Sequence, residues 1–506
     1  MLLGIDVGTS STKALLLDAD GRVAGEGSAA HAVRAPRRGW AESDPEDWWS
    51  TTTAAVRAAV GSRADTIRAI GLSGQMHGVV LADAGGAPLR PAILWADGRS
   101  AAALDAYRAL PEALVERLGN PIVTGMAGPS LLWLREHDPR VYAAAAWALQ
   151  PKDWLRHRLT GTFETDPSDA SGTLLYDVAA DAWSEAVVER LALRPGLLAP
   201  IRAATDVAGG LRPAAGAALG LRPGIPVVVG GGDTAAAAVG AGLVGSEKAQ
   251  LAIGTGAQLV VDLAQPRPDP SHRTHLFRAA APHGWYALAA MQNAGLALEW
   301  CLRVLGRDWA WAYDHAFESP PGADGLTFLP YLSGERTPHM DPRARGGWVG
   351  LGLDHGPATM MRAALEGVAY AVRDGLDALQ DAGHAVADLR LVGGGTGDSR
   401  WRQLLADVLG RALLPIDVPA ASARGAALLA GAGSGFAPDG ALGPSAAGER
   451  IEPGPDAPVY ASSLARFREL GALAQVGTQA PLRAARAGAR TEDAGGTPPA
   501  WRRSRV

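Results

Sequence analysis

The first 75 residues alternate short apolar runs with turns and one amphipathic stretch. Residues 2–7 and 13–18 are apolar runs joined through the turn GTSS, so they predict two strands of a hairpin, with a third strand at 21–27. Residues 44–60 open with Asp and Pro, which are typical of a helix start, and predict a helix. Residues 67–74 predict a buried strand that ends in glycine. Strands that alternate with helices indicate the α/β class.

The same pattern returns in the second half of the chain. Residues 251–263, LAIGTGAQLVVDL, repeat the apolar run, Gly-Thr turn and apolar run of residues 2–18. The repeat predicts two related domains whose Gly-Thr turns face one ligand across a cleft. Coincidence is the alternative, because strand-turn-strand patterns are common and short apolar runs are ambiguous.

A glycine-rich turn lies between two further elements at 389–410. This stretch predicts a strand, the turn GGGTG and a helix whose apolar residues share one face, with Gly410 at the C-terminal stop. Residues 356–379 and 422–431 are rich in small residues and predict closely packed helices.

The length of 506 residues exceeds what one core usually holds, so two domains are expected. We place them at 1–243 and 244–478, with a hinge near 243–250. Residues 479–506 lack apolar periodicity and collect Arg, Gly, Ala and Pro, which predicts a disordered tail.

Composition excludes several classes of protein. The net charge of −5 and the absence of a basic stripe before the C-terminus argue against a general nucleic-acid binder. Cys301 is the single cysteine, which rules out an intrachain disulfide and a multi-cysteine metal site and favours a core position. No window of 18 uninterrupted apolar residues predicts a membrane span, and the N-terminus lacks signal-peptide features, so a cytoplasmic protein is expected.

The first hairpin carries groups suited to phosphate and metal. Asp6 ends the first strand beside a glycine turn whose N–H groups can bind phosphate oxygens, and it could hold Mg²⁺ through water. Lys13 on the next strand could reach a terminal phosphate. The spacing is not that of a Walker A loop. The alternative makes Asp6 a solvated strand-end acid and Lys13 a surface lysine.

A second group of polar residues suits a sugar. Gln75, Met76 and His77 lie between two glycines at a strand end, where a neutral imidazole can donate to and accept from hydroxyl groups. Asp97 and Arg99 in ILWADGRS add further polyol-binding groups. A histidine that only satisfies a contact of the fold is the alternative.

One carboxylate stands alone in an apolar stretch. Asp233, in VVVGGGDTAAAAVGAG, is the only charged residue between Arg222 and Glu247. It either caps the helix that TAAAAVG predicts or lies where a substrate approaches closely packed backbone.

These stretches together resemble the FGGY carbohydrate kinases of the actin-like ATPase superfamily, from residue 1 to about residue 435. After MLLGIDVGTSSTK, the stretches that carry the resemblance are GWAESDPEDWW, SGQMHG, PAILWADGR, QPKDWLRHRLTG, DASGTLLYD, VVVGGGDTAAAAVG, IGTG, FLPYLSGERTPH and LVGGGTGDSRWRQLLADVLG. The resemblance implies an α/β fold with two ribonuclease H-like domains flanking a central cleft. SGQMHG and SGERTPH favour the members that phosphorylate D-xylulose at its 5-hydroxyl with ATP.

The resemblance also implies roles for individual residues. Asp233 is expected to be the general base and, with Asp6, to hold Mg²⁺, while Met76 and His77 contact the sugar. The nucleotide is expected at three glycine turns and one lysine: Gly8, Thr9, Ser10 and Lys13; Gly254, Thr255 and Gly256; and Gly394, Gly395 and Ser399.

Three positions depart from the family pattern. Ala96 replaces an Asn beside the expected sugar site, Ser130 replaces a Lys before LLW, and the second Gly-Thr turn reads GTGAQ in place of GTSG. The first two bear on the choice of sugar, so a kinase for another ketose or polyol, such as ribulose, is the first alternative.

The partners expected are a small sugar and ATP, with a possible homodimer and with neither nucleic acid nor membrane. A non-catalytic actin-like ATP sensor is the alternative from another class. Such a protein would need neither the SGQMHG stretch nor a base at Asp233.

Overall fold

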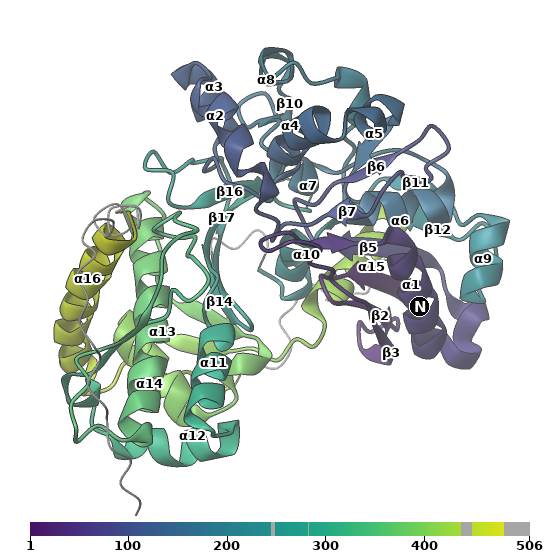
Figure 1. Ribbon diagram of the computed structural model, residues 1–506. Coiled ribbons are helices and arrows are strands. Elements are labelled where there is room, and N and C mark those ends of the chain that lie inside the picture. Colours follow the sequence, from purple (N-terminus) through teal and green to yellow (C-terminus); the bar gives the residue numbers. More distant parts are fainter. Residues whose placement is uncertain (244–247, 282, 437–447, 480–506) are drawn as a thin grey trace, which may run out of the picture.

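The computed structural model describes residues 1–243, 248–281, 283–436 and 448–479, which form two domains (Figure 1). Residues 244–247 of the expected hinge at 243–250 lie outside the described part of the chain, as do residues 480–506 of the expected tail at 479–506; residue 479 itself ends the last described helix. Each domain is built on a mixed sheet that is covered by helices.

The first domain forms around the N-terminal hairpin that the apolar pattern predicted. The antiparallel strands β1, β2 and β3 are extended by β5 and β12, which run parallel to β1, and by β11 at the edge. Helix α1 (Pro45–Val60) packs on β2 and β3, and Asp44 caps it, as the sequence indicated. The strands are β1 (Leu2–Val7), β2 (Ser11–Leu17), β3 (Val23–Ala30), β5 (Ala69–Gly74), β11 (Val207–Gly210) and β12 (Pro226–Val228).

The second domain repeats this topology. Its antiparallel strands β14, β15 and β17 correspond to β1, β2 and β3, and the parallel strands β20 and β21 correspond to β5 and β12. The duplication that the Gly-Thr pattern predicted is therefore confirmed. The strands are β14 (Ala249–Ile253), β15 (Ala257–Leu263), β16 (His275–Arg278), β17 (Trp285–Met291), β20 (Leu389–Val392) and β21 (Leu413–Pro415).

Helix α15 (Ala421–Ser434) returns from the second domain to the first. It packs against β1, β5 and α10 (Asp233–Gly240), as Figure 1 shows. The approach is close enough that a Cβ on Gly4 would lie 1.8 Å from the carbonyl oxygen of Ala423, and one on Gly71 1.8 Å from that of Ala426. A single division near residue 243 therefore misses this helix, which completes the first domain.

The remaining elements cover the two sheets or form small additions beside them. The strands are β4 (Glu42–Ser43), β6 (Val80–Ala82), β7 (Ala92–Ile93), β8 (Trp147–Leu149), β9 (Tyr176–Asp177), β10 (Ala182–Trp183), β13 (Gly231–Gly232), β18 (Thr327–Leu329) and β19 (Gly347–Val349). The helices are α2 (Leu104–Arg108), α3 (Glu112–Leu118), α4 (Ala127–His137), α5 (Pro139–Ala144), α6 (Pro151–Thr160), α7 (Pro167–Ser171), α8 (Glu185–Arg190), α9 (Pro213–Leu219), α11 (Gly295–Leu305), α12 (Trp309–His315), α13 (Pro357–Asp381), α14 (Ser399–Leu409) and α16 (Ala457–Gln479).

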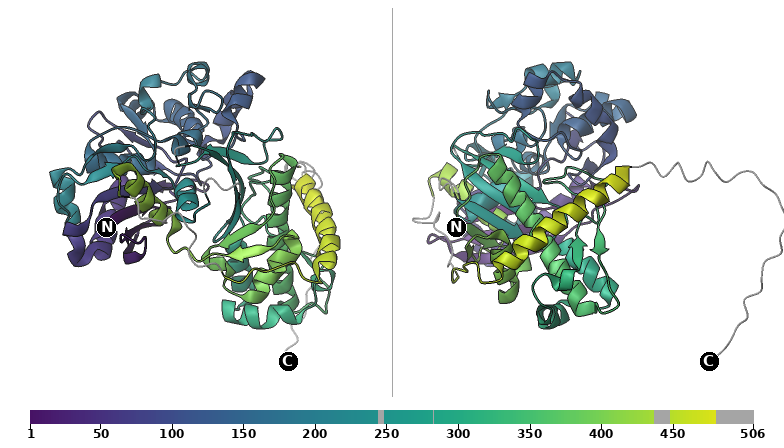
Figure 2. Two further views of the ribbon diagram at one scale, coloured as in Figure 1. Left: turned by 180° about the vertical axis from the view of Figure 1, so that it is seen from behind. Right: turned by 90° about the vertical axis from the view of Figure 1, so that its left-hand side faces the viewer.

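Each domain has its own apolar core. Trp48 and Trp154 are fully buried in the first, and Cys301 is buried in the core of the second, as its sequence context predicted. Helix α16 lies on the side of the second domain that faces away from the first (Figure 2). Among the described residues, no helix is long and apolar enough to cross a membrane.

Candidate active site between the domains

Asp233 is the first residue of α10, one position past the helix cap. Gly232 occupies the cap position, so the interpretation of Asp233 as the cap is wrong. Its Oδ1 accepts a hydrogen bond from the N–H of Thr234 at 2.6 Å, and Oδ2 has no hydrogen bond to any described residue. The helix start therefore fixes one carboxylate oxygen and leaves the other available.

The surroundings of Asp233 favour its protonated form. Burial raises the pKa of this half-buried carboxyl to about 7, the negative charge of Asp6 adds to the rise, and the hydrogen bonds from Thr234 oppose it. Burial also raises the pKa of Asp6, although the Ser73 hydroxyl donates to its Oδ1 at 2.8 Å. A carboxyl with a pKa near neutrality is well matched to general base catalysis.

A cavity of about 850 Å³ is lined by both domains, by Asp6 itself and by Thr234, the residue after Asp233, although Asp233 is not in the lining. Asp6 and Lys13, which are paired across the first hairpin, line it from one side together with Thr234. The second domain contributes Gly394 and the guanidinium-bearing Arg402. The cavity thus brings carboxylates, cations and glycine backbone to one space, which suits a polyanionic ligand with its metal ion.

A second cavity of about 700 Å³ shares Gly394 with the first. Three further residues of the predicted nucleotide turns line it: Gly254, Thr255 and Gly395. Its wall also includes Trp309 and Tyr313 of α12, whose rings stack at 5.5 Å. The two cavities therefore form neighbouring compartments on either side of the turn at Gly394.

Five predicted nucleotide residues lie outside the linings of both cavities. Ser399 is exposed at the start of α14, Gly256 packs where a Cβ would meet the Met291 carbonyl at 2.7 Å, and the others are Gly8, Thr9 and Ser10. The turn at Gly8–Ser10 is anchored by Gln75, whose side-chain amide donates to the Gly8 carbonyl at 3.2 Å.

The SGQMHG stretch joins the two domains. Met76 is buried, and its Sδ accepts from the Tyr286 hydroxyl of the second domain at 3.5 Å. His77 has a positive φ of 72°, and its Nδ1 lies 2.7 Å from the Gly172 carbonyl. Burial lowers the pKa of His77 to about 4, and the nearby charge of Arg336 acts in the same direction. The ring is therefore neutral at physiological pH, with Nδ1 donating to Gly172.

Asp97 and Arg99 have a different place from the one predicted. Their side chains are each 1% exposed and form a buried ion pair, with two guanidinium nitrogens of Arg99 donating to the Asp97 carboxylate at 2.7 and 2.8 Å. Asp97 also accepts from the Ala41 N–H at 2.6 Å, and Arg99 donates to Glu42 at 2.7 Å. Both groups are saturated by protein contacts, so the prediction that they bind sugar is not supported: they hold the loop in place.

Two residues that lie beside the predicted site were not singled out individually from the sequence. Arg336 belongs to the SGERTPH stretch of the second domain, and its guanidinium lies 5.2 Å from the Trp95 ring centre of the first domain. The Trp95 indole N–H donates to the Thr9 hydroxyl at 2.9 Å. The only sequence signal for Arg336 is its place in SGERTPH, because its contact partner Trp95 lies 241 residues earlier in the chain.

The structure also shows where two of the residues that depart from the family pattern lie. Ala96 is exposed, whereas Ser130 is buried inside α4, where its N–H donates to the Met126 carbonyl at 3.3 Å.

Comparison with known proteins agrees with this geometry. Residues 1–240 match the N-terminal domain and residues 249–434 the C-terminal domain of the FGGY family of carbohydrate kinases. A xylulose kinase of Escherichia coli (strain K12) is 38% identical over 416 residues, covering 82% of this chain and 86% of that protein. A xylulose kinase of Streptomyces coelicolor is 36% identical over 447 residues, covering 85% of this chain and 88% of that protein.

Solved structures give the same answer. The crystal structure of xylulose kinase from Rhodospirillum rubrum superposes with a TM-score of 0.85 at 31% identity, covering 95% of this chain and all (100%) of that one. Two family models, long alignments and a shared two-domain fold therefore agree. The chain belongs to the FGGY family of carbohydrate kinases, enzymes that transfer a phosphoryl group from ATP to a sugar.

Proposed function

We propose that this kinase phosphorylates D-xylulose at its 5-hydroxyl, giving D-xylulose 5-phosphate and ADP, with Asp233 as the general base. The choice of sugar is supported by relatives named xylulose kinase that align with more than four fifths of the chain. The observation that carries the mechanism is the environment of Asp233: its pKa is raised to about 7, and both its neighbour Thr234 and the nearby Asp6 line a cavity shared by the two domains.

The reaction needs one proton acceptor and accurate alignment. As the sugar oxygen forms its bond to the γ-phosphorus of ATP, the hydroxyl proton passes to Asp233, and the bond from that phosphorus to the β,γ-bridging oxygen breaks to release ADP. A base in this position contributes about 10²–10⁴-fold to the rate. Because Oδ1 is engaged by Thr234, Oδ2 is the oxygen that takes the proton.

We assign a different part of the nucleotide to each of the two cavities. We assign the phosphates to the larger one, where Lys13 offers positive charge and the turn at Gly393 and Gly394 offers backbone N–H groups. The adenosine is placed against Gly394 and Gly395 in the smaller one, where Trp309 and Tyr313 supply apolar surface for a base.

The carboxylates fit a magnesium ion that arrives with the nucleotide. The described residues contain no cluster of three or more His, Cys, Asp or Glu side chains able to hold a metal alone. Mg²⁺ commonly binds through one or two carboxylates together with substrate phosphates and waters. Burial raises the pKa of Asp233 and the negative charge of Asp6 raises it further; a divalent cation relieves that repulsion. When bound, it neutralises charge on the phosphoryl oxygens.

The sugar is placed between Asp233 and the SGQMHG stretch. Met76 offers adaptable apolar contact and a neutral His77 offers Nε2 as a hydrogen-bond acceptor for a hydroxyl, since Nδ1 is engaged by Gly172. Trp95 and Arg336, which meet across the two domains, close the same region.

The test is a coupled ADP-release assay with D-xylulose, D-ribulose, L-ribulose, L-xylulose, glycerol and gluconate. We expect the highest kcat/KM with D-xylulose and a product phosphorylated at C5 by ³¹P–¹H NMR. A clear preference for another of the sugars would overturn the substrate. The absence of stimulation by any of them would overturn the proposed activity.

A further inference from the structure

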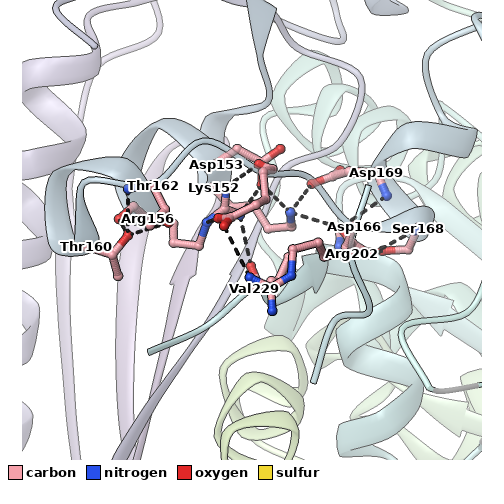
Figure 3. A network of polar contacts seen from close by, with 12 residues as sticks. Lys152, Asp153, Arg156, Thr160, Thr162, Asp166, Ser168, Asp169, Arg202 and Val229 are labelled. Carbon is pink, nitrogen blue, oxygen red and sulfur yellow. Dashed lines mark hydrogen bonds and ion pairs between the residues drawn. The ribbon is translucent and has the colours of Figure 1, made fainter. Parts of the chain in front are cut away.

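Behind Asp233, the first domain buries a charged cluster that the reaction itself does not use (Figure 3). Lys152 is 0% exposed, and its ammonium lies 2.6 Å from Asp153, 2.9 Å from Asp166 and 3.1 Å from Asp169. Arg156, also fully buried, pairs with Asp153 at 2.7 Å. Buried charges are costly to desolvate, so a cluster of this size is weak evidence for a purely stabilising role.

The cluster reaches the backbone that leads into the base. The Ser168 hydroxyl donates to Asp166 and accepts the Gly232 N–H at 2.9 Å. At the other end of the turn, Arg156 donates to the Val229 carbonyl at 3.2 Å. The stretch 229–232, a turn that runs into the two-residue strand β13, is therefore held at both ends by side chains of the cluster in addition to the pairing of β13 with β5, and the sticks in Figure 3 show the contact of Arg156 with Val229.

This turn is built largely from glycine. Gly230 has a positive φ of 81°, and a Cβ there would lie 2.2 Å from the Leu72 carbonyl oxygen. A Cβ on Gly232 would lie 2.6 Å from Met76 Cγ. Close packing thus requires glycine, whose backbone is intrinsically permissive, so the pairing of β13 with β5 and the hydrogen bond to Ser168 are the restraints that fix it.

We propose that Ser168, oriented by Asp166 and Lys152, is a positioning residue that sets the Asp233 carboxylate by fixing the N–H of Gly232. This inference rests on the proposed role of Asp233. Ser168 binds the residue directly before the base, and a displacement of about 1 Å at a reacting group can cost about 10²-fold in rate. The carboxylates and cations of the cluster act through this hydroxyl without meeting the substrate.

The sharpest comparison is between S168T and S168V, which have the same shape and differ only in the hydroxyl. We expect S168T to keep kcat within about threefold of wild type and S168V to lower it by roughly 10–100-fold, with KM for ATP unchanged. S43A is the control for the general loss of a buried serine hydroxyl, because Ser43 is 0% exposed and donates only to the Ala32 carbonyl.

A double-mutant cycle with D233N separates positioning from general damage. If Ser168 acts through the base, S168V lowers the residual rate of D233N by less than threefold. The assay uses the sugar that wild type prefers, so a wrong substrate leaves the test intact, whereas an unaffected D233N identifies failure of the base assignment.

Three results would overturn the inference: equal kcat for S168T and S168V per folded molecule, a loss in S168V no larger than in S43A, or a full loss that persists in the D233N background.

Discussion

Replacing Asp233 by Asn removes the proposed base while leaving a side chain of the same shape. The amide oxygen can still accept from the Thr234 N–H, which now lies 2.6 Å from Oδ1, so the start of α10 is kept. With no acceptor for the hydroxyl proton, kcat should fall by at least about 10²-fold.

The same substitution should stabilise the protein at high pH. The pKa of Asp233 rises on folding from an ordinary value of about 4 to about 7. Well below pH 4, both states carry the proton, so this group contributes nothing to folding stability. As pH rises through this window the unfolded state loses its proton first, and above about pH 7 the folded state bears the full cost of the charge.

The size of this effect follows from the shift. Three pKa units correspond to at most about 4 kcal/mol. Because Asp233 is half-buried beside an open cavity, solvent screening reduces the expected gain in D233N to about 1–2 kcal/mol at pH 8, fading toward pH 4.

Two measurements check the reasoning: coupled ADP release at saturating sugar, and urea unfolding at pH 8 and pH 4.5 without nucleotide or metal. D44N, at the cap of α1, is the matched control and should leave kcat unchanged. A D233N variant that keeps more than about a tenth of wild-type kcat refutes the base. One that is less stable than wild type at pH 8 refutes the electrostatic account and favours a role at the helix start.

The other predictions concern the loop, the domain packing and the metal. D97A should lower the free energy of unfolding by roughly 1–3 kcal/mol, because the buried Arg99 guanidinium loses two hydrogen bonds but keeps its ion pair with Glu42, while KM for the sugar stays unchanged per folded molecule. A tenfold rise in that KM would restore the sugar-binding interpretation. G71A, whose new Cβ would lie 1.8 Å from the Ala426 carbonyl, should destabilise the protein by about 3 kcal/mol in urea unfolding, and G196A, with no atom within 4 Å, should not. Chelation by EDTA should abolish ADP release, and added Mg²⁺ should restore it; full turnover in EDTA would exclude the proposed metal.

The local pattern predicted the parts of the fold that depend on near neighbours. Strand-turn-strand periodicity gave the first hairpin and its counterpart at β14 and β15, and the cap at Asp44 marked the start of α1. The same local pattern supplied the two candidate roles of Asp233, a helix cap or a carboxylate that a substrate approaches. In the structure Gly232, one residue before Asp233, occupies the cap position, so Asp233 is not the cap.

Features that depend on distant partners could not be read locally. Helix α15 is rich in alanine and glycine, and nothing in such a composition indicates which sheet the helix will join. Asp97 and Arg99 are two residues apart, and that spacing suits a ligand as well as it suits the mutual ion pair that forms. Lys152 carries a charge that usually marks the surface, so its complete burial follows only from three carboxylates that the fold gathers around it.

The separation between Asp233 and the nearby cations explains why its pKa can stay near neutrality. Lys152 and Arg156 lie in the same domain, but their charges are taken up by Asp153 and its neighbours in the cluster, and no described cation forms an ion pair with Asp233. A lysine or arginine bound to this carboxylate would lower its pKa and weaken it as a base. The cluster therefore supports the turn through the neutral hydroxyl of Ser168, which restrains the backbone and transfers no formal charge to the base.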